Sequence, residues 1–216
     1  LELLPDKPIV GVFEPHFHKT IPDYAYTYGI PQQWADKYSI RRYGFHGMSH
    51  SYVCLRAAQF LGRRPNEVEI VSCHLGNGSS LCAVDHGRSM DTTMGFTPVE
   101  GLIMGTRCGD VDAGVITFLE RTSGLTVPQI DELINKKSGL LGLSGISSDM
   151  REILTAAEAG ESRALIALKT YCYRIRKYIG AYVAAMGGLD AVVFTGGVGQ
   201  GSDMVRALAP DAPFLV

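Results

Sequence analysis

Two segments place basic side chains between glycines, a pattern that suits contact with a phosphoryl or carboxylate group. Residues 41–50 have the sequence RRYGFHGMSH, in which His46 is flanked by glycines, and residues 104–110 have the sequence MGTRCGD around Arg107. Glycine leaves room for a ligand, and a guanidinium offers a planar fork of donors to an anion. Taken singly, either residue could instead be structural or part of a surface ion pair.

Two glycine-rich stretches follow segments that we predict to be strands. Residues 73–80 have the sequence CHLGNGSS, and residues 194–199 have the sequence FTGGVG. Successive backbone N–H groups in such turns can form an anion-binding concavity, and open α/β sheets bind ligands at the carboxyl ends of their strands. Neither stretch is a Walker A loop or a clean GxGxxG motif. Each stretch alone is also typical of a simple tight turn.

A carboxylate and two histidines lie close together near the beginning of the sequence, at Glu14, His16 and His18. A carboxylate at the end of a strand can position Mg²⁺, so Glu14 is our candidate metal ligand. Alternate histidines on a strand share one face, which leaves a zinc site as a competing interpretation, although no third ligand is evident.

The pattern of apolar residues and turn residues predicts the elements that position these side chains. We expect strands over residues 9–13, 69–74, 80–84, 88–92 and 189–195. We expect irregular turns and short helical pieces over the aromatic stretch at residues 22–42, which contains Tyr24, Tyr26, Tyr28, Trp34 and Tyr38. We expect helices over 49–61, 111–122, 128–136, 148–158 and 161–186. The three central strands should form an antiparallel meander, and the order of strands, helices and a final strand predicts an α/β fold. No repeat or linker interrupts residues 1–216, so we expect a single domain.

Composition narrows the class of protein. The 216 residues carry a formal net charge of -2, without the basic excess of a nucleic-acid-binding or membrane-surface protein. The apolar runs are too short to span a membrane. The 5 cysteines include no CxxC pair, which suits reduced thiols in the cytoplasm. The absence of an initial Met, and a strand-like ending over residues 213–216, suggest a fragment of a longer protein.

Several segments of the sequence, in the order in which they occur along the chain, resemble the acetate kinase family. The matching segments are residues 12–18, 41–50, 73–80, 90–110, 135–151 and 193–199. Two of the matches are long and specific, MGFTPVEGLIMGTR over residues 94–107 and NKKSGLLGLSGISSD over residues 135–149. The resemblance implies a ribonuclease H-like domain of the actin, sugar kinase and heat-shock ATPase superfamily. This domain would be the second half of a two-domain kinase, with the N-terminal domain and C-terminal tail of the family outside this sequence.

The resemblance also implies an activity, namely reversible, Mg²⁺-dependent phosphorylation of acetate by ATP in a cytoplasmic homodimer. Phosphoryl transfer mainly requires positioning and positive charge, and a carboxylate acceptor is already ionised at neutral pH. Two alternatives stay open at this point. One is a propionate or butyrate kinase, and the other is a nucleotide-binding module of the same fold that has lost catalysis.

Residue roles follow from the same resemblance, position by position. Glu14, His46 and Arg107 match catalytic positions, and Glu14 is also the expected metal ligand. Nucleotide-binding positions fall on His74, Asn77, Gly78, Asp149, Arg151, Gly197, Val198 and Gly199, and Phe45 and Pro98 match walls of the acyl pocket. Two departures stand out, because the family usually has Asp where this chain has Glu14 and Asn where it has Gly201.

Overall fold

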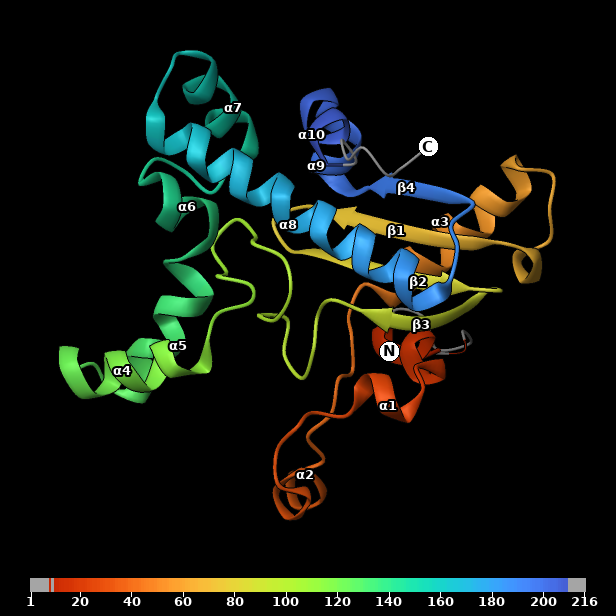
Figure 1. Cartoon of the computed structure of the whole chain (residues 1–216), viewed down its shortest axis with the longest axis horizontal. Coiled ribbons are helices and arrows are strands. Elements are labelled where there is room, and N and C mark those ends of the chain that lie inside the picture. Colours follow the sequence, from red (N-terminus) through yellow and green to blue (C-terminus); the bar gives the residue numbers. More distant parts are fainter. Residues whose placement is uncertain (1–7, 9, 210–216) are drawn as a thin grey trace.

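A mixed four-stranded sheet forms the centre of the molecule, as described by a computed structural model for residue 8 and residues 10–209 (Figure 1). The strands are β1 (Glu69–Leu75), β2 (Ser79–Asp85), β3 (Arg88–Thr92) and β4 (Ala191–Thr195), in the order β3-β2-β1-β4. β1 pairs antiparallel with β2, β2 pairs antiparallel with β3, and β4 pairs parallel with β1. The predicted meander is therefore confirmed, and β4 extends it.

Helices cover both faces of this sheet, because successive strand residues point to opposite sides. On one face, Val71, Cys73 and Leu75 of β1 pack with buried residues of the long helix α8 (Ser162–Met186), including Tyr171 and Ile175. On the other face, Ile70, Cys82 and Val84 pack with Cys54 and Ala58 of α3 (Gly47–Phe60). This arrangement is the layered α/β architecture that the order of elements predicts.

The remaining helices are short and lie around the sheet and the two covering helices. They are η1 (Glu14–Thr20), α1 (Asp23–Tyr26), α2 (Gln32–Tyr38), η2 (Pro65–Glu67), α4 (Ala113–Ser123), α5 (Val127–Lys136), α6 (Gly139–Ser144), α7 (Met150–Glu158), α9 (Gly196–Gly201) and α10 (Asp203–Leu208). Figure 1 shows α4 and α5 as an arm that extends away from the sheet, and α2 at the tip of a second projection. Within the described residues, no helix has both the length and the apolar character needed to cross a membrane.

Three local expectations differ from the structure. Residues 10–13 are not a strand, and Phe13 is 77% exposed. They precede η1, which has Pro15 in its first turn and packs beside β3. The predicted glycine loop over residues 196–199 is the start of helix α9, and α6 and α10 were also not predicted. Ile9 and the strand-like ending over residues 213–216 lie outside the described residues.

Candidate active site

Three of the glycine-containing motifs meet beyond the carboxyl end of β1. His46 is the N-cap of α3, Gly78 lies in the turn between β1 and β2, and Arg107 lies in the long loop between β3 and α4. A Cβ atom built at Gly78 would lie 3.2 Å from Nη1 of Arg107 and 3.7 Å from Nε2 of His46. The absence of a side chain at Gly78 therefore leaves a small space that faces both basic side chains.

The Arg107 loop is fixed by backbone hydrogen bonds to its neighbours. The N–H of Gly105 donates to the carbonyl of Asn77 (3.1 Å), and the N–H of Leu140 in α6 donates to the carbonyl of Met104 (2.8 Å). A Cβ atom at Gly105 would lie 2.1 Å from Oδ1 of Asn77, so a side chain there would displace the Asn77 amide. The loop is thus held between the β1–β2 turn and α6. The guanidinium of Arg107 forms no ion pair with any residue that the structure describes.

His46 and His74 lie side by side, with ring centroids 4.2 Å apart and an interplanar angle of 22°. Burial lowers the pKa of His46 to about 4, and the nearby positive charges of His74 and Arg107 add to this effect. Burial also lowers the pKa of His74, opposed by the negative charge of Glu14. At neutral pH the fixed positive charge of the site therefore comes from Arg107, whereas His46 is an uncharged hydrogen-bonding group.

Glu14 lies at the start of η1, half-buried and close enough to His74 to affect its pKa. Its carboxylate has no hydrogen bond or ion pair with any of the described residues. Such a carboxylate suits a hard cation such as Mg²⁺, which takes one or two carboxylates and otherwise water and phosphate oxygens. The residues present therefore fit the metal that the family resemblance implies.

The zinc interpretation for this segment is not supported. Residues 14–20 form a 3-10 helix, so His16 and His18 do not share the face of a strand. Both ring nitrogens of His18 are already engaged, Nδ1 with Oγ of Ser89 (2.8 Å) and Nε2 with the carbonyl of Phe45 (2.9 Å). His16 is exposed.

A cavity of about 440 Å³ opens next to the β1–β2 turn. Five of the residues that sequence analysis assigned to nucleotide binding line it, namely Asn77, Asp149, Arg151, Gly197 and Val198. Gly199 does not, because it is buried against Phe194 and Leu75. His74, in β1, and Gly78, in the turn itself, do not line the cavity. The structure thus places predicted nucleotide-binding residues of the β1–β2 turn, of α9 and of the start of α7 around the same cavity.

Much of the cavity wall was not predicted from sequence. The lining residues that were not expected are Leu140, Ser148, Met150, Leu154, Tyr171 and Ser202, whereas Gly76 belongs to the glycine-rich stretch over residues 73–80. The apolar members lie on α6, α7 and α8 with the spacing of ordinary core residues, so no sequence signal separates them from the core. Gly201 lines the cavity, and a Cβ atom there would meet nothing within 4 Å. The side chain usual in the family is therefore missing where space exists for it.

Asp149 and Arg151 act together at the rim of this cavity. Asp149 is the N-cap of α7 and accepts a hydrogen bond from the backbone N–H of Arg151 (2.9 Å). The side chains also pair, with Nη2 of Arg151 2.5 Å from Oδ2 of Asp149. These hydrogen bonds lower the pKa of Asp149 to about 2. The pair holds the Arg151 guanidinium, whose side chain is 89% exposed, beside the cavity.

The two predicted acyl-pocket residues lie on different segments. Phe45 directly precedes His46, and its carbonyl accepts the hydrogen bond from His18. Pro98 is half-buried between Thr97 and Val99, which line an open groove of about 1180 Å³ together with Arg107.

Comparisons with known proteins show which proteins this chain is similar to. The sequence profile described as Acetokinase family matches residues 1–212. A relative from Bacteroides thetaiotaomicron named acetate kinase is 57% identical over 214 residues, covering 99% of this chain and 54% of the relative. One from Carboxydothermus hydrogenoformans, also named acetate kinase, is 56% identical over 205 residues, covering 95% of this chain and 51% of the relative.

Solved structures show the same likeness. The crystal structure of Porphyromonas gingivalis acetate kinase superposes with a TM-score of 0.95 at 51% identity, covering 96% of this chain and 52% of the other. A propionate kinase from Francisella tularensis gives a TM-score of 0.91 at 40% identity, with coverage of 96% and 53%. The chain spans about half the length of the curated relatives it matches. The chain belongs to the acetokinase family, which is part of the actin-like ATPase superfamily.

Proposed function

We propose that the protein containing this chain is an acetate kinase, which phosphorylates acetate reversibly with ATP to give acetyl phosphate and ADP. The observation that carries this proposal is the convergence of His46, Gly78 and Arg107 beside a nucleotide-sized cavity. The cavity volume of about 440 Å³ falls in the range of small-molecule sites. The relatives named acetate kinase support the same substrate.

In this proposal, the base and ribose of ATP occupy the cavity against Gly197 and Val198, with Asp149 and Arg151 at its rim. The phosphates extend past Asn77 toward Gly78 and His74, where backbone N–H groups of a glycine turn can approach phosphate oxygens. This path leads from the cavity to the space between His46 and Arg107. Gly199 supports the site only by packing beneath it, because it is buried.

The chemistry follows from the charges at this space. An oxygen of the acetate carboxylate attacks the γ-phosphorus, the bond from that phosphorus to the β,γ-bridging oxygen breaks, and ADP leaves with the electron pair. Arg107 offers a fork of donors to the equatorial oxygens, and uncharged His46 offers a neutral hydrogen bond. Mg²⁺, when bound near Glu14, supplies charge neutralisation at the phosphate oxygens.

Acetate kinase activity has a direct test. The complete protein, incubated with ATP, Mg²⁺ and acetate, should form acetyl phosphate, which hydroxylamine traps as the hydroxamate. Stoichiometric ATP binding by calorimetry without hydroxamate formation would instead identify a nucleotide-binding module that lacks catalysis. Binding of neither substrate would contradict both functions.

The acyl chain that the enzyme prefers is a separate question, since a propionate kinase also superposes closely on this chain. We propose acetate, with Phe45 and Pro98 as walls of a small pocket near Arg107. A hydrophobic pocket discriminates one methylene by only about 10–200-fold. We therefore expect kcat/KM for acetate to exceed the values for propionate and butyrate. The reverse order would assign the protein to the longer acids.

We further propose that residues 1–216 form one domain of a cytoplasmic homodimer. The aromatic stretch offers exposed apolar surface at Tyr24 (76%), Trp34 (46%) and Tyr38 (56%). The five free thiols suit a reducing compartment. Sedimentation of the complete protein at micromolar concentration should give the mass of a dimer, and a monomer alone would contradict this expectation.

A further inference from the structure

Behind His46 lies a row of buried side chains that the proposed mechanism does not use. Nδ1 of His46 is 2.9 Å from Oγ of Ser80, and the same oxygen is 2.8 Å from Nε2 of His50. On its other side, Nδ1 of His50 is 2.9 Å from Oγ of Ser72. Ser72, Ser80 and His50 are each 0% exposed. The row therefore joins the site to the interior of the sheet through three hydrogen bonds.

The three hydrogen bonds of this row must be oriented together, so the row has only two consistent arrangements of donors and acceptors. Ser80 has a single hydroxyl hydrogen, so it donates to one imidazole nitrogen and accepts from the other. His50 is uncharged, because complete burial lowers its pKa well below the ordinary value of 6.5. If Ser80 donates to Nδ1 of His46, the proton of His46 is on Nε2. If Nδ1 of His46 instead donates to Ser80, Nε2 of His46 carries no hydrogen.

Ser72 selects between these directions. The Ser72 hydroxyl is hydrogen-bonded to Nδ1 of His50. It also interacts with the thiol of Cys54. Sulfur is a weak acceptor compared with an imidazole nitrogen, and a buried hydroxyl hydrogen without a good acceptor is unfavourable. Ser72 therefore donates to Nδ1 of His50. Nε2–H of His50 then donates to Ser80, and Ser80 donates to Nδ1 of His46.

We propose that Ser72, His50 and Ser80 are positioning residues that hold the proton of His46 on Nε2. That nitrogen faces the space beside Gly78 and Arg107. An N–H group there can donate to the oxygens of a transferring phosphoryl group, whereas a bare nitrogen would repel them. The catalytic consequence rests on the proposed function, but the position of the proton does not.

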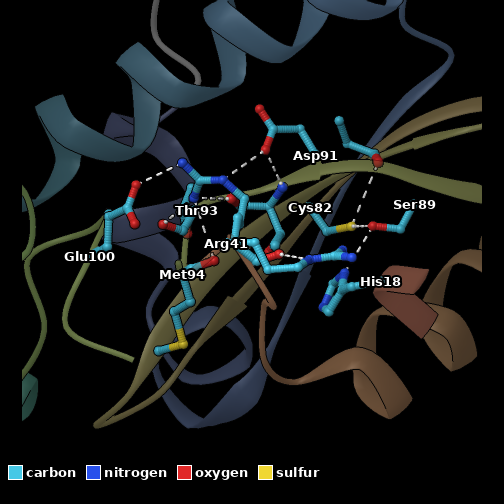
Figure 2. Close-up of polar contacts among 12 residues, drawn as sticks. His18, Arg41, Cys82, Ser89, Asp91, Thr93, Met94 and Glu100 are labelled. Atoms are coloured by element: carbon cyan, nitrogen blue, oxygen red, sulfur yellow. Dashed lines mark hydrogen bonds and ion pairs between the residues drawn. The ribbon is translucent and has the colours of Figure 1, made fainter. Parts of the chain in front are cut away.

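A second histidine–serine pair provides a matched control. The carbonyl of Phe45 can only accept, so Nε2 of His18 donates to it and Ser89 donates to Nδ1 of His18. Figure 2 shows this contact between His18 and Ser89. Ser89 is also 0% exposed, yet it has no hydrogen bond to His46. Ser89→Ala thus removes a buried hydroxyl from a histidine without interrupting the row behind His46.

The position of the proton can be measured by long-range ¹⁵N–¹H correlation in the complete protein labelled with ¹⁵N-histidine. His46→Gln identifies the His46 signals. We expect wild-type protein and Ser89→Ala to carry the proton on Nε2, and Ser80→Ala to lose this preference. Ser72→Ala is the second variant, for use if Ser80→Ala fails to fold. A wild-type His46 protonated on Nδ1, or unchanged signals in both row variants, would overturn the inference.

Kinetics give an independent readout of the catalytic consequence. Loss of a hydrogen-bond partner that orients a metal-binding histidine typically costs about 10–100-fold in activity, and we take the same scale for His46. We expect this loss in kcat for Ser80→Ala, with little change in KM, and recovery of most of kcat in Ser80→Thr, which keeps the hydroxyl. Ser89→Ala should retain kcat. If wild-type protein lacks kinase activity but His46 is protonated on Nε2, only the proposed function fails. Unchanged kcat in a Ser80→Ala protein with an altered tautomer would refute the catalytic role.

Discussion

Arg107 is the residue on which the charge of the candidate site depends. His46 is uncharged at neutral pH because its pKa lies at about 4. The Arg107 guanidinium forms no ion pair with any described residue, so its charge is available to a ligand. Gly78 leaves open the space in front of it. A phosphoryl group entering this space would therefore meet one fixed positive charge from this chain and one neutral donor.

Arg107→Ala should lower kcat by about 10²–10³, the usual effect of removing one donor to a developing charge. Arg107→Lys should recover only part of the activity, because an ammonium keeps the charge but lacks the planar fork. The hydroxamate assay measures both variants. Arg88→Ala, an exposed arginine at the start of β3, is the control and should be nearly silent. A folded Arg107→Ala protein with near-normal kcat would show that the arginine is not part of the catalytic site.

At the scale of elements, side chains also attach the loop that carries Arg107 to the body of the protein near each of its ends. Near its beginning, Nη2 of Arg42 is 2.6 Å from Oε1 of Glu100, and Nη1 of Arg42 donates to the carbonyl of Thr92 (2.7 Å). Figure 2 shows Glu100 and Asp91 near the guanidinium at the centre of this network. Near its end, the hydroxyl of Tyr178 in α8 donates to Oδ2 of Asp110 (2.5 Å).

Glu100→Ala should lower the free energy of unfolding by about 1.5–3 kcal/mol, the usual contribution of a hydrogen bond to a charged group. The side chain of Arg42 is only 17% exposed, so water replaces the lost partner poorly. Glu67→Ala removes the partner of Arg64, whose side chain is 77% exposed, and should cost less than Glu100→Ala, because water screens an exposed ion pair. Urea unfolding compares the two variants. Equal losses would mean that the Arg42 network does not fix this loop.

Elements with strong local signals were predictable from sequence, and those set by tertiary contacts were not. The meander over residues 69–92 has short β-rich segments separated by glycine turns, and the predicted strand bounds agree with the structure within one residue. α6 and α9 are short and glycine-rich, so no apolar period reveals them. Residues 10–13 have strand-forming residues but no strand pairing in the described sheet. The motifs locate His46 and Arg107, whereas the row through Ser80 depends on cross-strand geometry that no motif encodes.

At the scale of the whole molecule, four histidines connect elements that are distant in sequence. His18 of η1, His46 and His50 at the start of α3, and His74 of β1 lie with neighbouring rings 4.2–6.4 Å apart. Burial lowers the pKa of all four. The folded chain therefore binds fewer protons at this cluster of histidines than the unfolded chain does, and this difference makes the stability of the fold depend on pH.

The direction of this linkage follows from the sign of the shifts. The folded pKa values lie below the ordinary value of 6.5, so the unfolded chain binds more protons and stability rises with pH. We expect the free energy of unfolding to fall as pH decreases from about 6.5 toward 4, the pKa of His46. Asp149, whose pKa is about 2, contributes only below this window.

Urea unfolding at pH 7, 6 and 5 measures the change of the free energy of unfolding with pH. In His46→Gln we expect this change to be smaller, because the variant lacks one of the titrating histidines. His86→Gln is the control, because His86 is exposed in the turn between β2 and β3 and lies outside the cluster. That variant should keep the full change with pH. Stability that does not change between pH 7 and pH 5 would mean that the four histidines bind as many protons in the folded protein as in the unfolded chain. In that case, burial would not keep His46 uncharged, and His46 would gain a positive charge beside Arg107 below about pH 6.5.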